Sequence, residues 1–539
     1  MKRSAKGPMP HPIHRSPDRP RSGRGLALSA SVSLLALIAA CGSTRPEIVE
    51  PIEPPALAPD ASVAAPERQP PPPSGPRRDV SFPAITRAEL GSGLELNTVS
   101  WRQLPIVYLR LVVRSGSEAD PSETPGMANL VADMLKEGTR NRSSATIAEQ
   151  IEFLGADLSV GADEENTYIT MRALAEHMDA AMELLADVAM NPSFRADELE
   201  KLTVRELDRL TVSQQRPEWL ARRAFYQELY GDHPYGHVDT TPEVLRRIRR
   251  ADLARWHRAH FVPSNAFLVI TGDVSPEQAQ ARAEAHFGRW RDRPSSTPAA
   301  APPPEPEGRR VIVIDRPGSI QSLIFIGNRA IERGHEDWVR LAVANQVLGG
   351  SAASRLFMDL RERRSLTYGA YSQVGERVQV APFISYASVE TPNTGPALDA
   401  FFEHLDRIVA EEPSEEEIAN ARRFLSDSFP LQIDTPGKIN SMIADLRIFG
   451  MADDYWDRFR TRILEVDGQA ALAAARSHIR PSQALIVIVG NAAEIVPDAR
   501  RFGPVRVLDT DGAEKERFEA LDAPPVEAAP AASPEPSPR

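Results

Sequence analysis

The 539-residue sequence contains a single cysteine, Cys41, so no disulfide can form within the chain and a disulfide-stabilised scaffold is excluded. Long hydrophobic runs are also missing: Leu26–Ala40 is uncharged, but its 15 residues are fewer than the ~20 that a membrane-spanning helix needs. Positive charge is not in excess either. The formal net charge is −12, which argues against nonspecific nucleic-acid binding. Neither a G-x-S-x-G nucleophile motif nor a glycine-rich phosphate loop is present.

Proline, by contrast, is abundant and unevenly placed. The 48 prolines concentrate before residue 79, between Pro294 and Pro306, and after residue 523. Because they are not periodic and 42% of all residues are hydrophobic, a collagen-like or wholly disordered chain is excluded. We expect these stretches to be a tether, an interdomain linker and a disordered tail. The remaining chain is long enough for two or three domains with full cores.

The first 40 residues predict a secretory signal peptide. A basic start is followed by the apolar Leu26–Ala40, and small residues stand directly before Cys41. This order resembles a bacterial lipobox, which implies that Cys41 is lipidated and that residues 41–78 tether the protein to the membrane. No aspartate follows Cys41, which favours a lipid anchor in the outer membrane facing the periplasm of a bacterial cell envelope. A plain signal peptide or an uncleaved anchor is the alternative.

The remaining sequence predicts an α+β fold of two duplicated domains. Apolar strands alternate with amphipathic helices, as in the strand expected at Leu104–Val113 and the helix expected at Pro125–Glu137. Phe261–Asp273 aligns without gaps to Ile479–Asn491: in both, a helix ends, Pro-Ser turns the chain and an apolar strand stops at glycine. Each domain should hold a mainly antiparallel sheet packed against helices. The expected boundaries are a first domain at 79–291, a linker at 292–309, a second domain at 310–500 and an extension with the tail at 501–539.

Several motifs, in order along the chain, resemble the insulinase/pitrilysin family of zinc metallopeptidases. They include Gly126–Thr139 (GMANLVADMLKEGT), where that family carries H-x-x-E-H on a helix, the turn His233–Gly236, and Leu360–Gly369 (LRERRSLTYG). These matches cover nearly everything between residues 80 and 495. The resemblance implies the family's fold of two metallopeptidase-like α/β sandwich domains and a function connected with proteolysis.

The zinc ligands of that family are missing. In H-x-x-E-H, two histidines at i and i+4 reach one ion from one helical face and the glutamate activates the zinc-bound water. The corresponding residues are Asn129, Ala132 and Asp133, and the family's third ligand, a glutamate, aligns with Arg209. Glu206 lies one turn before Arg209. The resemblance therefore implies a degenerate metal site, no zinc on this chain and no catalysis by it alone.

A second family feature is present. The family's second domain supplies an arginine and a tyrosine, seven residues apart, that bind the substrate peptide; Arg361 and Tyr368 match this pair. Guanidinium donors suit peptide carbonyls, and a tyrosine hydroxyl can donate to a developing oxyanion. The alternative is a surface arginine paired with a carboxylate and a core tyrosine. The resemblance also implies that the strand near Leu158–Thr170 offers an edge to an extended peptide.

Two histidine pairs are further candidates for metal ligands. His257 and His260 lie among arginines, which favours a solvated helix face, and His233 and His237 flank a turn, which favours a role in that turn. Neither pair has an acidic base at a motif spacing.

Some relatives are two-chain enzymes in which one chain carries zinc and the other contributes the arginine–tyrosine pair. The resemblance thus implies a non-catalytic, substrate-binding subunit whose partners are a zinc-bearing homologous chain and an extended peptide. Two rival hypotheses stay open: a pseudoenzyme that binds peptides or scaffolds envelope proteins without proteolysis, and an autonomous enzyme with an unusual metal site.

Overall fold

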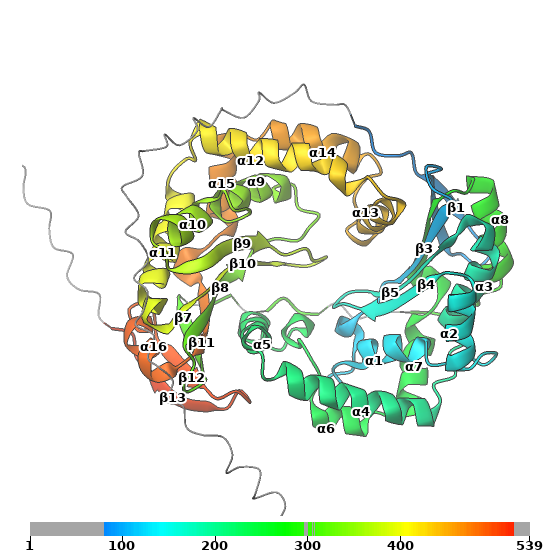
Figure 1. Cartoon of the computed structure of the whole chain (residues 1–539), viewed down its shortest axis with the longest axis horizontal. Helices are drawn as coiled ribbons and strands as arrows, with labels where there is room; N and C mark the ends of the chain where they lie inside the picture. Colours follow the sequence, from blue (N-terminus) through cyan, green and yellow to red (C-terminus); the bar gives the residue numbers. More distant parts are fainter. Residues whose placement is uncertain (1–79, 296–299, 304, 307, 522–539) are drawn as a thin grey trace, which may run out of the picture. The chain divides into compact units, whose positions relative to one another are not determined.

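A computed structural model describes residues 80–295, 300–303, 305–306 and 308–521 (Figure 1). They belong to one of two units of the chain, Arg77–Arg539. Cys41, the expected signal peptide, the whole tether and the final Ala/Pro-rich tail lie outside the described residues. None of the helices within the described ranges is both long and apolar enough to span a membrane.

The first half, residues 80–295, contains a six-stranded sheet in the order β1-β2-β6-β3-β5-β4. β2 and β6 are parallel, and the other neighbours are antiparallel. The expected strand and helix at the start of this half are present as β3 and α1, each slightly shorter than predicted. The strands are β1 (Thr86–Glu89), β2 (Glu95–Ser100), β3 (Ile106–Val113), β4 (Asp157–Ala162), β5 (Thr167–Leu174) and β6 (Ala266–Gly272). The helices are α1 (Met127–Leu135), α2 (Ser144–Phe153), α3 (Met178–Met190), α4 (Ala196–Ser213), α5 (Pro217–Tyr230), α6 (Pro242–Arg247), α7 (Arg250–His260) and α8 (Pro276–Phe287).

The second half, residues 308–521, contains a seven-stranded sheet in the order β13-β12-β7-β11-β8-β10-β9. Its strands are β7 (Arg310–Asp315), β8 (Gln321–Arg329), β9 (Thr367–Val374), β10 (Pro382–Glu390), β11 (Leu485–Gly490), β12 (Val505–Leu508) and β13 (Glu514–Phe518). Its helices are α9 (Trp338–Leu348), α10 (Arg355–Phe357), α11 (Thr394–Ala410), α12 (Glu415–Ser428), α13 (Pro436–Ile448), α14 (Tyr455–Leu464), α15 (Gly468–His478) and α16 (Ala492–Ala499).

The two sheets confirm the predicted duplication and the α+β class. The order β2-β6-β3-β5-β4 is repeated as β7-β11-β8-β10-β9, and the parallel pair β2/β6 corresponds to the parallel pair β7/β11.

One predicted boundary needs correction. The chain does not leave the second domain at residue 500, because β12 pairs parallel with β7 and β13 pairs with β12. β12 is only four residues long, too short for the alternation of apolar residues to stand out.

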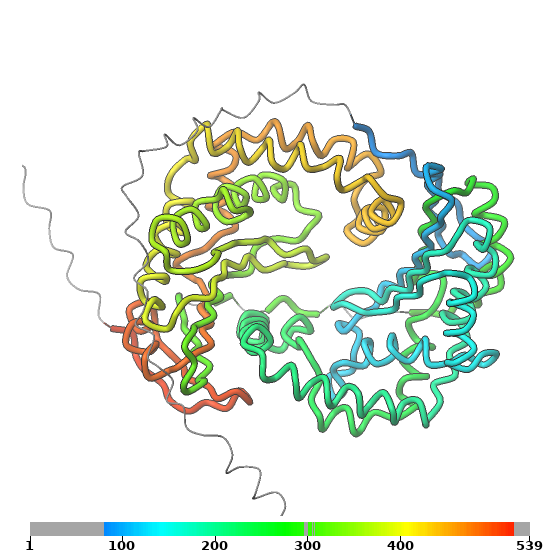
Figure 2. The backbone as a smooth tube through the Cα atoms, in the orientation of Figure 1, coloured from blue at the N-terminus to red at the C-terminus, as the bar shows by residue number. Residues whose placement is uncertain are grey.

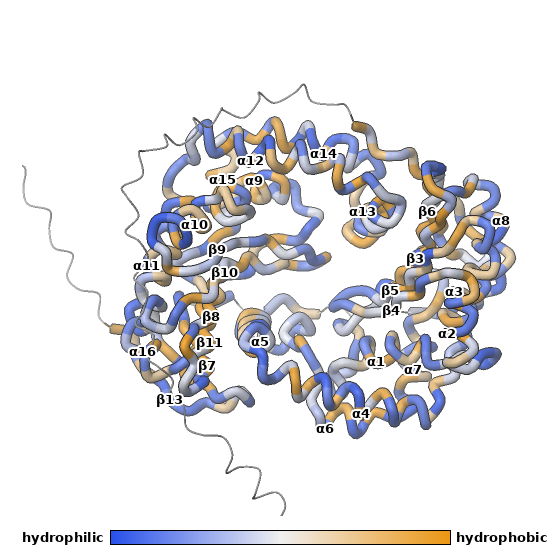
Figure 3. Tube along the Cα trace, viewed as in Figure 1, coloured by the Kyte–Doolittle hydropathy of each residue, from blue (hydrophilic) through white to orange (hydrophobic). Residues whose placement is uncertain are grey.

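The halves exchange one helix each. Along β3, Leu109 and Leu111 face the helices of their own half, whereas Val112 joins the core beneath α13 of the second half. Along β11, Ile486 and Ile488 face their own helices, whereas Val487 contacts the core around α5 of the first half. In Figure 2, α5 correspondingly lies beside the strands of the second sheet and α13 beside those of the first. The central residues of strands covered on both faces are apolar, as in Val311–Ile314 of β7 and Leu485–Val489 of β11, and orange predominates along β11 in Figure 3.

Glycine permits both exchanged helices to approach closely. A Cβ on Gly327 of β8 would lie 3.0 Å from Phe225 Cζ of α5 and still closer to a backbone oxygen. A Cβ on Gly437 of α13 would lie 2.8 Å from the ring of Tyr108 on β3. In addition, Asn440 of α13 donates from Nδ2 to two backbone carbonyls of the first sheet, at 3.2 and 3.3 Å. The exchanged helices are therefore positioned by close complementary packing as well as by the burial of apolar side chains.

Candidate functional site

The helix that would carry the zinc motif is formed and firmly capped. Gly126 precedes α1 with φ of 91°, a conformation that favours glycine. The Asp120 carboxylate accepts hydrogen bonds from the backbone N–H groups of Gly126 (2.7 Å) and Ala128 (2.8 Å). Asn129 and Asp133, at i and i+4, line a cavity of about 530 Å³, whereas Ala132 is buried. The framework of the family site is thus present, with different side chains on it.

Arg209 of α4 lies in the same cavity. Its Nε donates to Glu206 Oε2 at 2.6 Å, and its Nη2 donates to Asp239 Oδ1 at 3.4 Å. Trp219 Nε1 of α5 donates to the other oxygen of Asp239 at 3.0 Å. Burial opposes the charge of Arg209, but the hydrogen bond to Glu206 and the nearby carboxylates outweigh it and raise the pKa of the guanidinium. A fixed cation therefore occupies a position close to the carboxylates of this cavity.

These side chains do not fit a zinc ion. Burial raises the pKa of Asp133, which disfavours the ionised form that a metal needs, and Lys136 stands 4.0 Å from this carboxyl. Glu206 already pairs with Arg209, and the guanidinium would repel a second cation. Zinc sites in enzymes combine three protein ligands with water. The motif positions of this cavity carry no histidine, and His237, which also lines it, adds a single imidazole. No catalytic step through a metal can be assigned to these residues.

Arg361 and Tyr368 come together in the second half. Arg361 lies in a short π-helical turn, Met358–Arg363, and its Nη1 donates to the backbone carbonyl of Tyr368 at 3.0 Å. Ser365, with φ of 53°, ends that turn in a left-handed conformation, and the Leu366 N–H donates to Leu360 O at 2.8 Å. This reversal explains how residues seven apart become neighbours.

Tyr368 is not a core residue. Its side chain is 88% exposed at the start of β9, which contradicts the alternative of a buried aromatic. Arg361 lies 3.3 Å from Glu362 and packs over the Phe357 ring at 4.9 Å, so the alternative of a surface ion pair describes part of its surroundings. The arginine is held in place by its neighbours while the tyrosine ring projects from the strand.

Each sheet ends in a corresponding edge strand, but the outer edge of β9 is partly occupied, because the Ser372 N–H donates to Gly349 O at 3.0 Å and Ser372 O accepts from Asn345 Nδ2 at 3.1 Å. β4 ends the first sheet beyond β5, and β9 ends the second sheet beyond β10. Ala162, the last residue of β4, lines the same cavity as Asn129 and Arg209. Of the segment expected to offer an edge, 157–162 is therefore the edge strand, whereas β5 pairs on both sides. Such an edge can take up an extended peptide through main-chain hydrogen bonds.

Of the two histidine pairs, His257, His260 and His233 are structural, whereas His237 is exposed and lines the cavity of Asn129 and Asp133. The prediction of a solvated face for His257 and His260 is wrong, because both rings are buried: His257 Nε2 donates to Ala189 O at 2.8 Å, and His260 Nδ1 lies 3.1 Å from Ser115 Oγ. Burial lowers the pKa of His257 to about 4. His233 has the predicted turn role, since its Nδ1 accepts from the Tyr235 N–H at 3.2 Å.

Asp239 is a further residue of the cavity, and the sequence offers no signal for it. It lies 30 positions from Arg209, and no motif spacing links the two.

Two family models match the chain. The model described as insulinase (peptidase family M16) matches residues 98–242, and the model described as peptidase M16 inactive domain matches residues 247–425. Together they cover more than half of the sequence. The first match includes the degenerate motif on α1 as well as Arg209, and the second includes Arg361 and Tyr368.

Curated relatives are proteins named uncharacterized zinc proteases. One from Mycobacterium leprae is 27% identical over 53% of this chain and 65% of its own length. One from Mycobacterium tuberculosis (strain H37Rv) is 29% identical over 55% of this chain and 69% of its own length. One from Streptomyces coelicolor is 23% identical over 75% of this chain and 89% of its own length. The chain thus spans just under two thirds of the first of these relatives.

Two solved structures share the fold. A peptidase M16 inactive domain from Pseudomonas fluorescens superposes with a TM-score of 0.70 at 26% identity, covering 76% of this chain and 98% of that one. A protease from Helicobacter pylori superposes with a TM-score of 0.71 at 17% identity, covering 76% of this chain and 99% of that one, and shows the fold alone.

Proposed function

Because the chain belongs to the insulinase (peptidase M16) family and is peptidase-like, we propose that it is the non-catalytic, substrate-binding subunit of a two-chain zinc metalloendopeptidase. The observation that carries the proposal is the contrast between the two family sites. The cavity of the zinc motif holds Arg209 paired with Glu206, whereas Arg361 and Tyr368 lie together with the tyrosine ring exposed.

The proposed division of work follows from donor chemistry. A homologous partner chain with H-x-x-E-H would supply the zinc, the nucleophilic water and the general base. In this chain, Arg361 would bind a peptide carbonyl, and the Tyr368 hydroxyl would donate to a carbonyl or to the oxyanion that develops on it. An extended substrate would lie beside these two side chains at the start of β9.

The test is peptide cleavage by the two chains, purified separately and together. We expect no cleavage by the isolated chain, and none by this chain mixed with its partner when zinc is absent. The two chains together with zinc should be active. Arg361→Ala and Tyr368→Phe in the pair should each lower kcat/KM by about 10²-fold, the scale of losing one oxyanion donor. Matched controls are Arg363→Ala on the same π-helical turn and Tyr371→Phe on the same strand, both with near-normal cleavage. Unchanged cleavage in the Arg361 and Tyr368 variants would overturn the proposal.

The rival function makes an opposite prediction for the same material. A peptide-binding or scaffolding pseudoenzyme would bind extended peptides as an isolated chain and would add nothing to a zinc-bearing partner. The edge position of β4 favours peptide binding in both cases, so the gain of cleavage on mixing discriminates between the two functions.

We also propose that the protein is anchored in the outer membrane through a lipid on Cys41, by the lipobox-like order of residues 26–41. In a bacterial host, Cys41→Ser should abolish labelling by a radioactive fatty acid and move the protein from the membrane to the periplasmic fraction. Retention of the label in the variant would contradict the anchor.

A further inference from the structure

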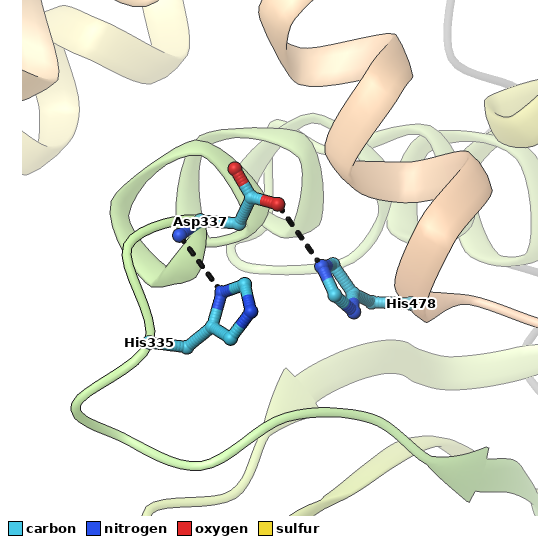
Figure 4. Close-up of side chains that lie close together, drawn as sticks. All are labelled: His335, Asp337 and His478. Atoms are coloured by element: carbon cyan, nitrogen blue, oxygen red, sulfur yellow. Dashed lines mark hydrogen bonds and ion pairs between the residues drawn. The ribbon is translucent and has the colours of Figure 1, made fainter.

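Away from the family sites, one cluster in the second half brings two imidazoles and a carboxylate together. Among the residues that the structure describes, His335, Asp337 and His478 place one potential ligand atom each within 4.8 Å of one another. Figure 4 shows the three side chains converging from the loop before α9, the start of α9 and the end of α15. Because His478 is about 140 positions from the other two, no local motif signals the cluster.

The geometry suits a shared ion. His478 Nε2 lies 3.3 Å from Asp337 Oδ2. A tetrahedral ion with bonds of ~2.0–2.1 Å to nitrogen and oxygen separates its ligand atoms by about 3.3 Å. The His335 and His478 rings meet edge to face with centroids 5.2 Å apart, which places the third donor beside the first two.

The backbone around the three residues is fixed without any ion. The Trp338 N–H donates to His335 O at 3.1 Å, which closes the turn that precedes α9. Asn328 Nδ2 donates to His478 O at 2.8 Å, which holds the end of α15. α9 and α15 pack against each other, so the ligands would join two helices that are already neighbours.

From these residues we infer a binding site for a divalent transition-metal ion, held by His335, Asp337 and His478 with water completing the coordination. Two imidazoles and one carboxylate favour zinc and its neighbours over calcium or magnesium. The site is separate from the zinc that the proposed function assigns to a partner chain. Its role is structural: it clamps the loop before α9 to α15.

Two interactions compete with the ion and make the inference testable. Arg340 Nη1 pairs with Asp337 Oδ1, and His335 Nδ1 accepts a hydrogen bond from the Asp337 N–H at 3.0 Å. An ion would leave the Arg340 contact in place on the far carboxylate oxygen, but the arginine charge weakens binding. A neutral imidazole has one lone pair on its ring nitrogens, and in His335 this lone pair accepts the hydrogen bond at Nδ1. His335 must therefore give up that hydrogen bond to bind the metal.

The experiment uses the mature chain, stripped with a chelator, loaded with zinc and desalted. We expect about one retained zinc per chain by elemental analysis and a higher unfolding temperature that the chelator reverses. His335→Ala and His478→Ala should each lose the retained zinc and the thermal shift. The matched control is His286→Ala, because His286 lies 3.3 Å from Asp179, a carboxylate that Arg282 also contacts at 2.9 Å. Arg340→Gln should tighten zinc binding by about 2- to 5-fold, the scale of removing an exposed ion pair.

Two further measurements keep the outcome decisive. The double variant Asp133→Asn, Glu206→Gln should retain zinc, and loss of zinc in that variant would place the ion in the first half and overturn the inference. Cobalt bound to the unsubstituted chain should give the visible absorption of a nitrogen- and oxygen-ligated ion, which does not depend on how well a variant folds. Failure of the unsubstituted chain to retain zinc, or retention by both histidine variants, would likewise refute the site.

Discussion

The two halves share a frame, which is the repeated order of five strands with the helices that cover them. Their arginines, however, have opposite roles. In the first half, Arg209 lies at the wall of a cavity, and its donors are directed to Glu206 and Asp239, so they serve the protein itself. In the second half, Arg361 supports the backbone of Tyr368, whose ring is left to solvent. The two sheets keep the same strand order although the side chains at the two sites differ. A duplicated domain can therefore lose one family site while the other keeps its geometry.

The largest effects should come from breaking the exchange of helices. Phe225→Ala in α5 and Ile443→Ala in α13 each remove a fully buried side chain that packs in the core between its helix and the other half's sheet. We expect each to lower the free energy of unfolding by about 3–4 kcal/mol, measured by urea denaturation. Phe153→Ala on α2 is the control, because this side chain is 85% exposed. A large loss for one helix only would show that the exchange is not symmetric.

A buried arginine makes the contact on the α13 side polar as well as apolar. Arg447 Nε donates to Asn97 Oδ1 of β2 at 2.8 Å, and its Nη2 donates to Asp453 at 2.6 Å. Arg447→Met leaves the fully buried Asn97 without this partner, and we expect a loss of about 2–3 kcal/mol in unfolding free energy. Arg458→Met removes an exposed helical pair with Asp454 and should cost less than about 0.5 kcal/mol. Equal costs for the two variants would contradict this assignment.

The halves also meet where Glu165 accepts hydrogen bonds from Tyr235 and from the Val378 N–H of the second half. Burial, with the charges of Glu165 and Asp163, raises the pKa of the nearby Glu118 from its ordinary value of 4.5 to about 7. A carboxyl with a raised folded-state pKa stabilises the fold below pH 4.5, and this contribution is lost as the pH rises through 7.

The Glu118→Gln variant tests this carboxyl. Because Glu118 is only partly buried, the expected gain at pH 8 is about 1–2 kcal/mol of unfolding free energy, discounted from the full shift. The gain should vanish near pH 4.5. Urea denaturation across this pH range provides the measurement, and a gain that does not change with pH would show that shape, not charge, is responsible.

Local patterns predicted the frame, and distant contacts were missed. The Pro-Ser turns before Phe267 and Leu485 revealed the duplication because turn chemistry acts within a few residues. The apolar face of α5 or α13 shows that something covers it but not which sheet does, so the exchange was not foreseen. His257 and His260 were misjudged because adjacent arginines point to other faces of α7, and the histidines share the buried face of Trp256. Asp239 was missed because ordinary loop residues give no spacing signal.

The smallest stability effects should lie at the two arginine sites themselves. Arg209→Gln releases two partly buried carboxylates and should lower the unfolding free energy by about 0.5–1 kcal/mol at pH 7. Tyr368→Phe removes a hydroxyl from an 88% exposed ring and should change it by less than about 0.2 kcal/mol. Thermal and urea unfolding of the two variants would measure the difference. If Tyr368→Phe proved as costly as Arg209→Gln, the tyrosine would be part of the frame, and its exposure could no longer be attributed to substrate binding.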